Sequence, residues 1–349
     1  MIGIGIVGIG FMGMVHYLTY RKLRGARVVA MCDTNPLRLA GDWRDIRGNF
    51  GPPGKRMDLA GVRTYSEVDE LLADKEVDLV DITLPPACHA DVACRALACG
   101  KHVLSEKPMA LTTADCRRMQ RAANSAGRQL LVAHVLPYFP EYAWALRLIR
   151  SGRYGQLRGG SFKRVIAEPK WLSNYWNPQQ VGGPMLDLHV HDAHFIRLLF
   201  GMPSSVVTRG TLCQGLPKYW HTLFAYPDRD YVVEATSGTI DQQGREFNHG
   251  FEIHLEQATL MFEFAVLAGQ GRYLCPPTLL DARGKVRQVR SPGGDPMDAF
   301  RAELRDVLRC VASNRTSDVL NGDLAADAIQ LCHKQSQSIA SGREIRVRR

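Results

Sequence analysis

The sequence predicts an α/β domain with a doubly wound parallel sheet over residues 1–135, followed by an α+β domain over residues 136–349 with a large, mostly antiparallel open sheet. Three observations predict this organisation. Short apolar runs alternate with helical patterns in the first part. The composition changes near Tyr138, and successive runs in the second part alternate apolar with polar residues. A chain of 349 residues has room for about two such domains.

The composition is that of an ordinary globular protein, with 45% apolar and 23% charged residues. We expect no membrane span, because no long apolar run occurs, and no signal peptide, because the first residues lack a basic segment. Nine cysteines without a C-x-x-C pair predict reduced thiols in a cytoplasmic protein. The net charge of +9 is either an ordinary basic surface or a field that attracts anionic ligands, and no nucleic-acid motif accompanies it.

The first predicted strand, Ile2–Val7, runs into GIGFMG, which has the G-x-G-x-x-G spacing of a dinucleotide-binding (Rossmann) turn. Gly8 permits the tight turn, Gly10 lets the backbone approach a pyrophosphate, and Gly13 lets helix and strand pack closely. The following helix, predicted to about Arg24, would direct its first N–H groups at the phosphates. The turn thus supplies these candidate cofactor contacts: Gly8, Gly10, Phe11, Met12 and Gly13.

The second predicted strand, Arg27–Cys32, ends at Asp33, about 20 residues beyond the glycine turn. A carboxylate at this point accepts hydrogen bonds from ribose hydroxyls and repels a 2′-phosphate. We therefore expect NAD rather than NADP. Arg38 lies nearby in the sequence and either weakens this discrimination or is a surface helix residue.

The alternation of strands and helices continues to residue 135, as a doubly wound sheet requires. The further expected strands are Val62–Tyr65, Val77–Thr83, His102–Glu106 and Gln129–Val135, and the expected helices are Ser66–Ala73, Ala87–Ala98 and Thr112–Ala126. Ligands bind outside the carboxyl ends of such strands. That rule gives these further candidate cofactor contacts: Thr83, Pro85, His89, Glu106 and Lys107.

Lys107 is a candidate for both the cofactor and the substrate, because it follows a buried strand and precedes a proline. The proline restricts the local backbone, and a cis bond there would aim the lysine side chain. The ordinary alternative is a solvated loop lysine.

The segment MLDLHVHDAHFIRLLFG, which begins at Met185, places several titratable residues in an apolar run. If Leu186–Leu199 is one helix, Asp187, His191 and His194 share a face at spacings i, i+4 and i+7. A polar stripe on a buried helix is costly unless its groups are paired or face a cleft. We therefore expect this stripe to line a substrate pocket, with a hydrogen bond to a buried partner as the alternative role of His194.

Three other residues near these motifs permit more than one interpretation. His189 points away from the stripe and is expected either in the core or as a support behind the site residues. Asp192 is either a surface acid or the partner of His16 or of a backbone N–H group. His16 is either a surface residue of the first helix or a contact on the cofactor side.

The second domain begins with a predicted helix, Pro140–Arg150, and a strand, Arg158–Ile166. Lys163 and Arg164 alternate along this strand, so that only one faces the cleft, and Arg164 is preferred as a substrate contact. The next segment, WLSNYWNP, offers Trp171 and Trp176 as aromatic rings of a ligand pocket, with a packing cluster as the alternative.

The remaining runs are SSVVTRGTLCQ, YWHTLFAY, YVVEATSGTI, GFEIHLEQ and TLMFEFAV, and their period of two predicts antiparallel strands. One face of this sheet carries enough aliphatic residues for a subunit interface, so we expect a homodimer or homotetramer. Closing helices over Asp298–Ala312 and Asp323–Ser341 are expected to pack back on the first domain.

These motifs together resemble the glucose–fructose oxidoreductase, inositol dehydrogenase and rhizopine-catabolism (Gfo/Idh/MocA) family. The resemblance rests on GIVGIGFMG followed by His16, on ITLPPACHADVACRALACGKHVLSEKP, on GGPMLDLHVHDAHFIRLLFG and on the final SGREIRV. It implies a two-domain NAD- or NADP-dependent oxidoreductase of sugars, cyclitols and related polyols. The lysine of the family's E-K-P motif corresponds to Lys107, and its D-x-x-x-H motif corresponds to Asp187 and His191.

Two departures from the family pattern concern the substrate. Pro137 stands in AHVLPYFPEY, where many relatives carry an arginine, and His194 stands where relatives often carry an aspartate.

The chemistry of alcohol oxidation assigns the roles. His191 is the expected general base, because its ordinary pKa lies near neutral pH. Asp187 orients the substrate, and Lys107 polarises the reacting oxygen. A zinc site from Asp187, His191 and His194 is geometrically conceivable, but we expect no metal, because hydride transfer to NAD needs none.

The leading hypothesis is thus an NAD-dependent dehydrogenase of a sugar, cyclitol or related polyol, with no nucleic-acid or membrane partner. One alternative is an NAD-dependent glycosidase that acts through transient oxidation. Another is a non-catalytic sensor of sugar or NAD.

Overall fold

The computed structural model spans residues 1–349 and describes all of them except 49, 171, 173, 230, 290–294 and 348–349. The chain forms two compact units. Unit 1 comprises Met1–Phe139 and Gly294–Ala326, and unit 2 comprises Pro140–Gly293 and Asp327–Arg349. The chain therefore leaves unit 1, builds most of unit 2, returns to unit 1 and ends in unit 2.

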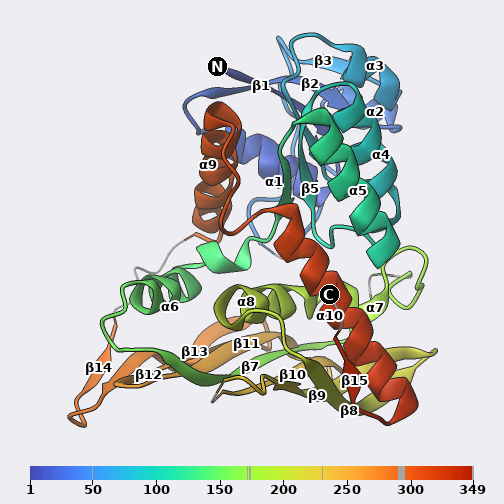
Figure 1. Ribbon diagram of the computed structural model, residues 1–349. Coiled ribbons are helices and arrows are strands. Elements are labelled where there is room, and N and C mark those ends of the chain that lie inside the picture. Colours follow the sequence, from blue (N-terminus) through green and yellow to red (C-terminus); the bar gives the residue numbers. More distant parts are fainter. Residues whose placement is uncertain (49, 171, 173, 230, 290–294, 348–349) are drawn as a thin grey trace. The chain divides into compact units, whose positions relative to one another are not determined.

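A parallel sheet forms the centre of unit 1 (Figure 1). Its six strands lie in the order β3-β2-β1-β4-β5-β6, and each neighbouring pair is parallel. The strands are β1 (Ile2–Val7), β2 (Ala26–Cys32), β3 (Arg63–Tyr65), β4 (Leu79–Ile82), β5 (His102–Glu106) and β6 (Leu130–Ala133). The direction of winding reverses between β1 and β4, which is where sheets of this kind bind ligands.

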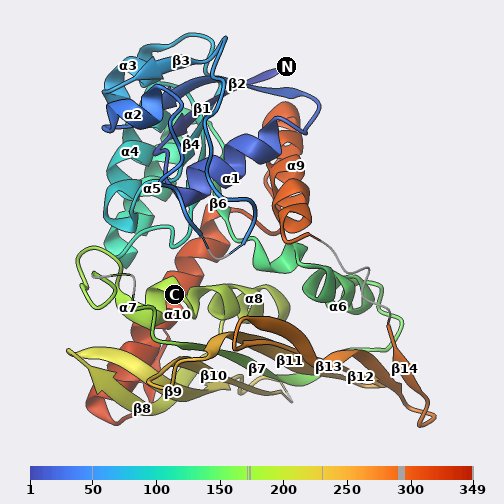
Figure 2. The same ribbon diagram turned by 180° about the vertical axis from the view of Figure 1, so that it is seen from behind.

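Helices cover both faces of this sheet, with α1 and α9 on one face and α3, α4 and α5 on the other (Figures 1 and 2). The helices of unit 1 are α1 (Phe11–Tyr20), α2 (Pro36–Leu39), α3 (Val68–Ala73), α4 (Pro86–Ala98), α5 (Thr113–Ala126), η1 (Leu136–Tyr138) and α9 (Met297–Ser313). Local sequence sets the ends of α5. Thr112 accepts a hydrogen bond from the Asp115 N–H group, and Gly127 ends the helix with a φ of 61°.

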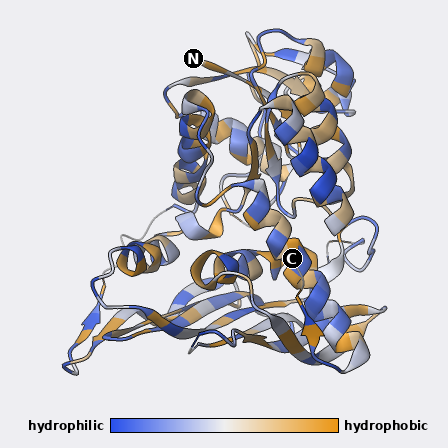
Figure 3. Cartoon of the chain, in the orientation of Figure 1, coloured by the Kyte–Doolittle hydropathy of each residue, from blue (hydrophilic) through white to orange (hydrophobic). Residues whose placement is uncertain are grey.

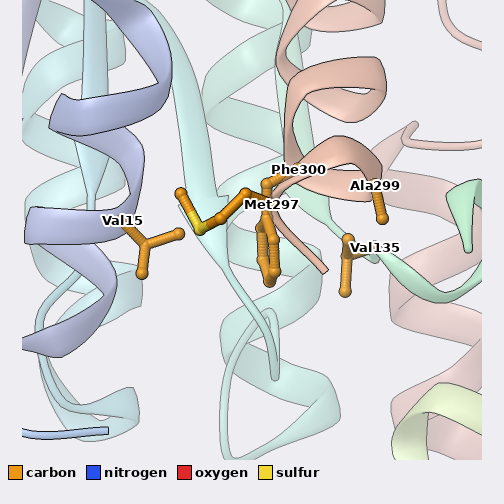
Figure 4. Packing of buried hydrophobic residues seen from close by; sticks show 5 residues of the cluster. All are labelled: Val15, Val135, Met297, Ala299 and Phe300. Atoms are coloured by element: carbon orange, nitrogen blue, oxygen red, sulfur yellow. The ribbon is translucent and has the colours of Figure 1, made fainter. Parts of the chain in front are cut away.

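Helix α9 is built into unit 1, although it follows the sheet of unit 2 in the chain. Its residues Met297, Ala299 and Phe300 form a buried cluster with Val15 of α1 and with Val135 (Figure 4). Each large apolar side chain buried in this way contributes about 1.5–3 kcal/mol. Packing of α9 is therefore part of the stability of the first unit.

Unit 2 contains a nine-stranded sheet in the order β14-β13-β12-β11-β7-β10-β9-β8-β15. All neighbouring pairs are antiparallel except β7 and β10, which are parallel. The strands are β7 (Leu157–Ala167), β8 (Ser205–Cys213), β9 (Leu216–Ala225), β10 (Val232–Ile240), β11 (Arg245–Leu255), β12 (Ala258–Leu267), β13 (Gln270–Asp281), β14 (Val286–Gln288) and β15 (Ile345–Arg346).

Hydrophobic and hydrophilic residues both occur along the strands of this sheet (Figure 3), and its two faces differ in burial. On β9, Trp220 and Phe224 are buried, whereas the alternate residues Tyr219 and Leu223 are exposed. The helices α6 (Pro140–Arg150), α7 (Gly183–Asp187), α8 (Val190–Phe200) and α10 (Gly322–Ser341, in unit 2 from Asp327) complete the unit. None of the described helices is long and apolar enough to cross a membrane.

The predicted fold class is confirmed, with a parallel Rossmann sheet in unit 1 and a large, mostly antiparallel sheet in unit 2. Two helix predictions need correction. The first helix ends at Tyr20, short of Arg24. The single helix expected over Leu186–Leu199 is two helices, α7 and α8.

Candidate functional site

The glycine turn between β1 and α1 has the geometry that its spacing predicts. Gly8 has a φ of 100°, and a Cβ there would lie 2.9 Å from the carbonyl oxygen of Thr83. A Cβ on Gly13 would lie 2.1 Å from the carbonyl oxygen of Gly8, so the close approach of helix and turn requires glycine. A Cβ on Gly10 would meet no heavy atom within 4 Å. Gly10 is the N-cap of α1 and no side chain caps this helix, so open space lies where a pyrophosphate would bind.

Asp33 lies beside this turn at the end of β2. Its Oδ2 accepts a 2.6 Å hydrogen bond from the Ile9 N–H group, and its Oδ1 accepts one of 2.8 Å from Asn35. These bonds fix the carboxylate next to the loop that a dinucleotide would occupy. Arg38 forms a 3.2 Å ion pair with Asp45.

Phe11 and Met12 begin α1, but their side chains pack against the buried cluster that holds α9. Phe11 also contacts Phe50 edge to face, with ring centroids 4.9 Å apart. Their side chains therefore serve packing, and the backbone of this first turn is the part that can contact a cofactor.

The loop after β4 is tied to its neighbours by two side chains. Thr83 donates a 2.7 Å hydrogen bond to the carbonyl oxygen of Gly8, and Pro85 is the N-cap of α4. His89 is fully buried, and its ring nitrogens lie 2.9 Å and 2.8 Å from the carbonyl oxygens of Pro108 and Leu84. Burial lowers the pKa of His89, so one N–H group of a neutral ring binds one of these carbonyls. His89 thus lies between the loops that follow β4 and β5 and donates a hydrogen bond to one of them.

The loop after β5 holds the E-K-P tripeptide. Oε2 of Glu106 accepts a 3.0 Å hydrogen bond from the Lys107 N–H group, and the Lys107–Pro108 peptide bond is cis. Every residue from 102 to 110 is buried except Lys107. Its side chain is the one in this stretch that reaches solvent.

In unit 2, the segment around Asp187 departs from a regular helix. The N–H groups of Leu188 and His189 both approach the carbonyl oxygen of Pro184, at 3.0 Å and 2.9 Å, so the bond to His189 spans five residues. One extra residue of this kind rotates the following helix relative to the preceding one. Asp187 therefore ends α7, and His191 lies in the first turn of α8, so the two residues belong to two helices and not to the single helix expected.

Asp187 and His191 nevertheless have one property in common. Every residue from 182 to 196 is buried except these two. His194, which was predicted on the same face, is fully buried, as is His189. The His189 ring lies 2.8 Å from the Ser237 hydroxyl, and burial lowers the pKa of His189 to about 3.

Arg164 occupies a different environment from the one expected. Its guanidinium forms a bidentate pair with Asp192 at 2.6 Å and 3.1 Å, and the two residues are 2% and 1% exposed. Asp192 is therefore neither a surface acid nor a partner of His16. A buried pair of this kind is costly to break, which argues against Arg164 as a direct substrate contact.

Trp176 is half-buried, and its indole N–H donates a 2.7 Å hydrogen bond to Glu168. Trp171 lies outside the residues that the structure describes. An open hollow elsewhere in unit 2 contains no predicted site residue, and it is lined by Arg153, Tyr154, Gln257, Asp281, Ala282, Arg283, Lys285 and Arg287. Across the described residues, no group of three or more His, Cys, Asp or Glu side chains could hold a metal ion.

Both units match models of one protein family. Residues 2–134 match the model described as "Oxidoreductase family, NAD-binding Rossmann fold" of the Gfo/Idh/MocA group. Residues 142–261 match the Gfo/Idh/MocA C-terminal domain. The chain belongs to the Gfo/Idh/MocA oxidoreductase family, as its motifs indicated.

Individual relatives share the fold at modest identity. A "1-carboxy-3-chloro-3,4-dihydroxycyclo hexa-1,5-diene dehydrogenase" of Comamonas testosteroni is 33% identical over 199 residues, which are 56% of this chain and 47% of the relative. This chain thus matches about half of the length of that relative. "Inositol 2-dehydrogenase 2" of Saccharopolyspora erythraea is 28% identical over 97% of this chain and 93% of its own. A solved structure, "Levoglucosan dehydrogenase, complex with NADH and levoglucosan", superimposes with a TM-score of 0.81 and 18% identity over 100% of both chains.

Proposed function

We propose that this protein is an NAD-dependent oxidoreductase that transfers hydride between the nicotinamide and a secondary hydroxyl of a sugar, cyclitol or related polyol. The observation that carries the proposal is the exposure of three polar residues in otherwise buried stretches. Lys107 is the one residue of 102–110 that is not buried, and Asp187 and His191 are the two such residues of 182–196. The names of the relatives, an inositol dehydrogenase and a levoglucosan dehydrogenase, support a polyol or sugar substrate.

The residues of unit 1 fit a dinucleotide cofactor. The open space at Gly10 and the uncapped start of α1 suit the pyrophosphate, and Asp33 suits the hydroxyls of a ribose. The loops after β4 and β5 would border the nicotinamide end, through Thr83, Pro85, His89, Glu106 and Lys107. NAD, when bound, supplies the acceptor for the hydride.

We infer NAD rather than NADP from the place of Asp33. Its carboxylate is fixed by two backbone N–H groups and would repel a 2′-phosphate. Arg38, the nearby cation of α2, is engaged by Asp45.

The protein's own side chains handle the proton and orient the substrate. His191 acts as the general base that takes the hydroxyl proton, because imidazole titrates near neutral pH. Asp187 orients the substrate, and Lys107 donates to the reacting oxygen and stabilises the negative charge that develops there. Trp176 and His194 are the remaining proposed contributors to the substrate pocket.

The uncovered face of the unit 2 sheet is proposed as a subunit interface of a homodimer or homotetramer. Tyr219 is 41% exposed, Leu223 47% and Val232 69%, which is a high exposure for apolar strand residues. Size-exclusion chromatography with light scattering tests the oligomeric proposal, and a monomer would contradict it.

All nine cysteines are free, which favours a reducing compartment such as the cytoplasm.

The activity is tested by following NADH absorbance at 340 nm with NAD and a panel of inositols, monosaccharides and anhydrosugars. The variants Lys107→Met and His191→Asn should each lower kcat by about 100-fold or more. Lys75→Met, at an exposed position of unit 1, is the matched control and should stay within twofold of the wild type.

Other outcomes would identify the two alternatives. Glycoside cleavage without net NADH formation indicates an NAD-dependent glycosidase. Binding of NAD and a polyol without any turnover across the panel indicates a sensor and contradicts the proposal.

A further inference from the structure

A cluster of buried ionisable side chains lies in unit 1 next to the E-K-P tripeptide, between helix α1 and strands β4 and β5. His16 of α1 is fully buried, and its Nδ1 lies 2.9 Å from Oδ2 and 3.1 Å from Oδ1 of Asp81 in β4. Its Nε2 lies 3.3 Å from Oε1 of Glu106 at the end of β5, in an ion pair without hydrogen-bond geometry. The two expectations for His16, a surface residue or a cofactor contact, are replaced by this pairing.

The sheet register explains why these groups meet. Asp81 is paired with Leu104 on the neighbouring strand β5. Side chains two residues apart on a strand share a face, so Glu106 lies on the same face as Leu104 and Asp81. Helix α1 covers this face and places the imidazole between the two carboxylates.

The charge state of His16 follows from its neighbours. Burial lowers the pKa of His16, but the Asp81 and Glu106 carboxylates outweigh burial and leave it well above the ordinary value. Two further buried ionisable groups interact with the cluster: Tyr20 with Asp81, and Glu303 with Glu106, His16 and Asp81. Burial raises the pKa of both, and the nearby carboxylates raise it further. At neutral pH, His16 is therefore the cation that compensates two buried carboxylates.

The two oxygens of Glu106 connect this cation to the proposed active lysine. Oε1 faces His16, and Oε2 accepts the hydrogen bond from the Lys107 N–H group at 3.0 Å. If the imidazolium were lost, Glu106 would keep a buried charge without its cation, and such a group reorients towards water or takes up a proton. Either change releases the backbone of Lys107.

We propose that His16 is a positioning residue, which holds the Glu106 carboxylate so that Glu106 fixes the main chain of Lys107 at the end of β5. This inference rests on the proposed role of Lys107 in catalysis. His16 itself touches neither cofactor nor substrate in this scheme. Misplacement of a reacting group by about 1 Å can cost about 100-fold in rate, so a distant histidine can affect turnover.

His16→Asn tests the link, because the asparagine amide replaces Nδ1 towards Asp81 but is too short to reach Glu106. We expect kcat for polyol oxidation to fall about 10- to 100-fold, with the Kd for NADH within about threefold of the wild type. Glu106→Gln should lower kcat similarly, and the double variant should lose little more, because both changes break one connection. His102→Gln removes another buried histidine, at the start of β5, and is the matched control with kcat within twofold.

A second measurement does not depend on turnover. Amide hydrogen exchange of Lys107, followed by NMR in protein labelled with 15N-lysine, should be about tenfold faster in His16→Asn and unchanged in His102→Gln. Unchanged exchange and unchanged kcat in a folded His16→Asn protein would overturn the inference, as would additive losses in the double variant. If the wild type oxidises no polyol, the proposed function fails, whereas the exchange comparison still decides the role of His16. If His16→Asn does not fold, Glu106→Gln alone gives the same two readouts.

Discussion

Two single variants, Gly10→Ala and Gly13→Ala, distinguish the role of the glycine turn in cofactor binding from its role in folding. The two glycines belong to one motif, yet their surroundings are opposite. A methyl group on Gly10 would enter space with no heavy atom within 4 Å, at a φ of −91° that alanine adopts readily. A methyl group on Gly13 would lie 2.1 Å from the Gly8 carbonyl oxygen and 3.0 Å from the Thr83 hydroxyl oxygen.

These distances set the magnitudes. Gly13→Ala forces the turn and helix apart, and overpacking of this kind costs about 1–3 kcal/mol. Gly10→Ala loses part of the helix N-cap preference of glycine but gains about 0.4–1 kcal/mol from a less flexible unfolded chain. Its net effect on the free energy of unfolding should be near zero. The methyl group would instead keep the pyrophosphate from the backbone N–H groups, and loss of one hydrogen bond to a charged group costs about 1.5–3 kcal/mol, roughly a 10- to 100-fold rise in Kd.

Fluorescence titration with NADH and urea unfolding of both variants measure the two effects. Gly10→Ala should unfold like the wild type and bind NADH 10- to 100-fold more weakly. Gly13→Ala should unfold at lower urea concentration. The reasoning is refuted if Gly10→Ala binds NADH as tightly as the wild type, or if Gly13→Ala is as stable as Gly10→Ala.

Three further predictions concern other parts of the chain. Asp33→Asn keeps a hydrogen-bond acceptor for Ile9 and removes the charge, so the affinity for NADPH relative to NADH should rise by about tenfold or more. An unchanged ratio of the two affinities in paired titrations would contradict the role of Asp33. Asp192→Asn leaves the buried guanidinium of Arg164 without its anion and should lower the free energy of unfolding by about 3–5 kcal/mol. The double variant with Asp192→Leu and Arg164→Met should lose less stability. Urea unfolding of both variants measures these losses, and equal losses of free energy would argue against a buried ion pair. Burial lowers the pKa of His189 from 6.5 in the unfolded chain to about 3, so the folded state binds fewer protons, and stability is lost as the pH falls below 6.5 towards 3. His189→Asn should therefore make the urea midpoint depend less steeply on pH in this range. An unaltered slope would contradict this role of His189.

The fold and the cofactor turn were predictable because their signals are local. Apolar runs such as Ile2–Val7 and Leu79–Ile82 are buried strands of the parallel sheet, and the spacing of Gly8, Gly10 and Gly13 reports a backbone requirement. The position of Lys107 directly after a buried strand was predictable for a similar reason, whereas its role in the site stays a prediction.

The break between α7 and α8 at Leu188 was not predictable from periodicity, because apolar residues occur on both sides of the turn in which the His189 N–H group binds the Pro184 carbonyl oxygen. A pattern of this kind fits one helix as well as two. The partners of His16 and Arg164 were also missed, because they lie 65 and 28 residues away in the sequence. One signal was available, since Asp81 stands inside an apolar strand, where a carboxylate requires a partner.

The central claim is that Lys107, Asp187 and His191 act on one substrate hydroxyl beside the cofactor. A crystal structure of the protein with NADH and a polyol that it oxidises tests this most directly. The account predicts that Nζ of Lys107 and a ring nitrogen of His191 both lie within hydrogen-bond distance of the same hydroxyl oxygen. A polyol bound with only one of these side chains in contact, or with its nearest carbon turned away from the nicotinamide, would contradict it.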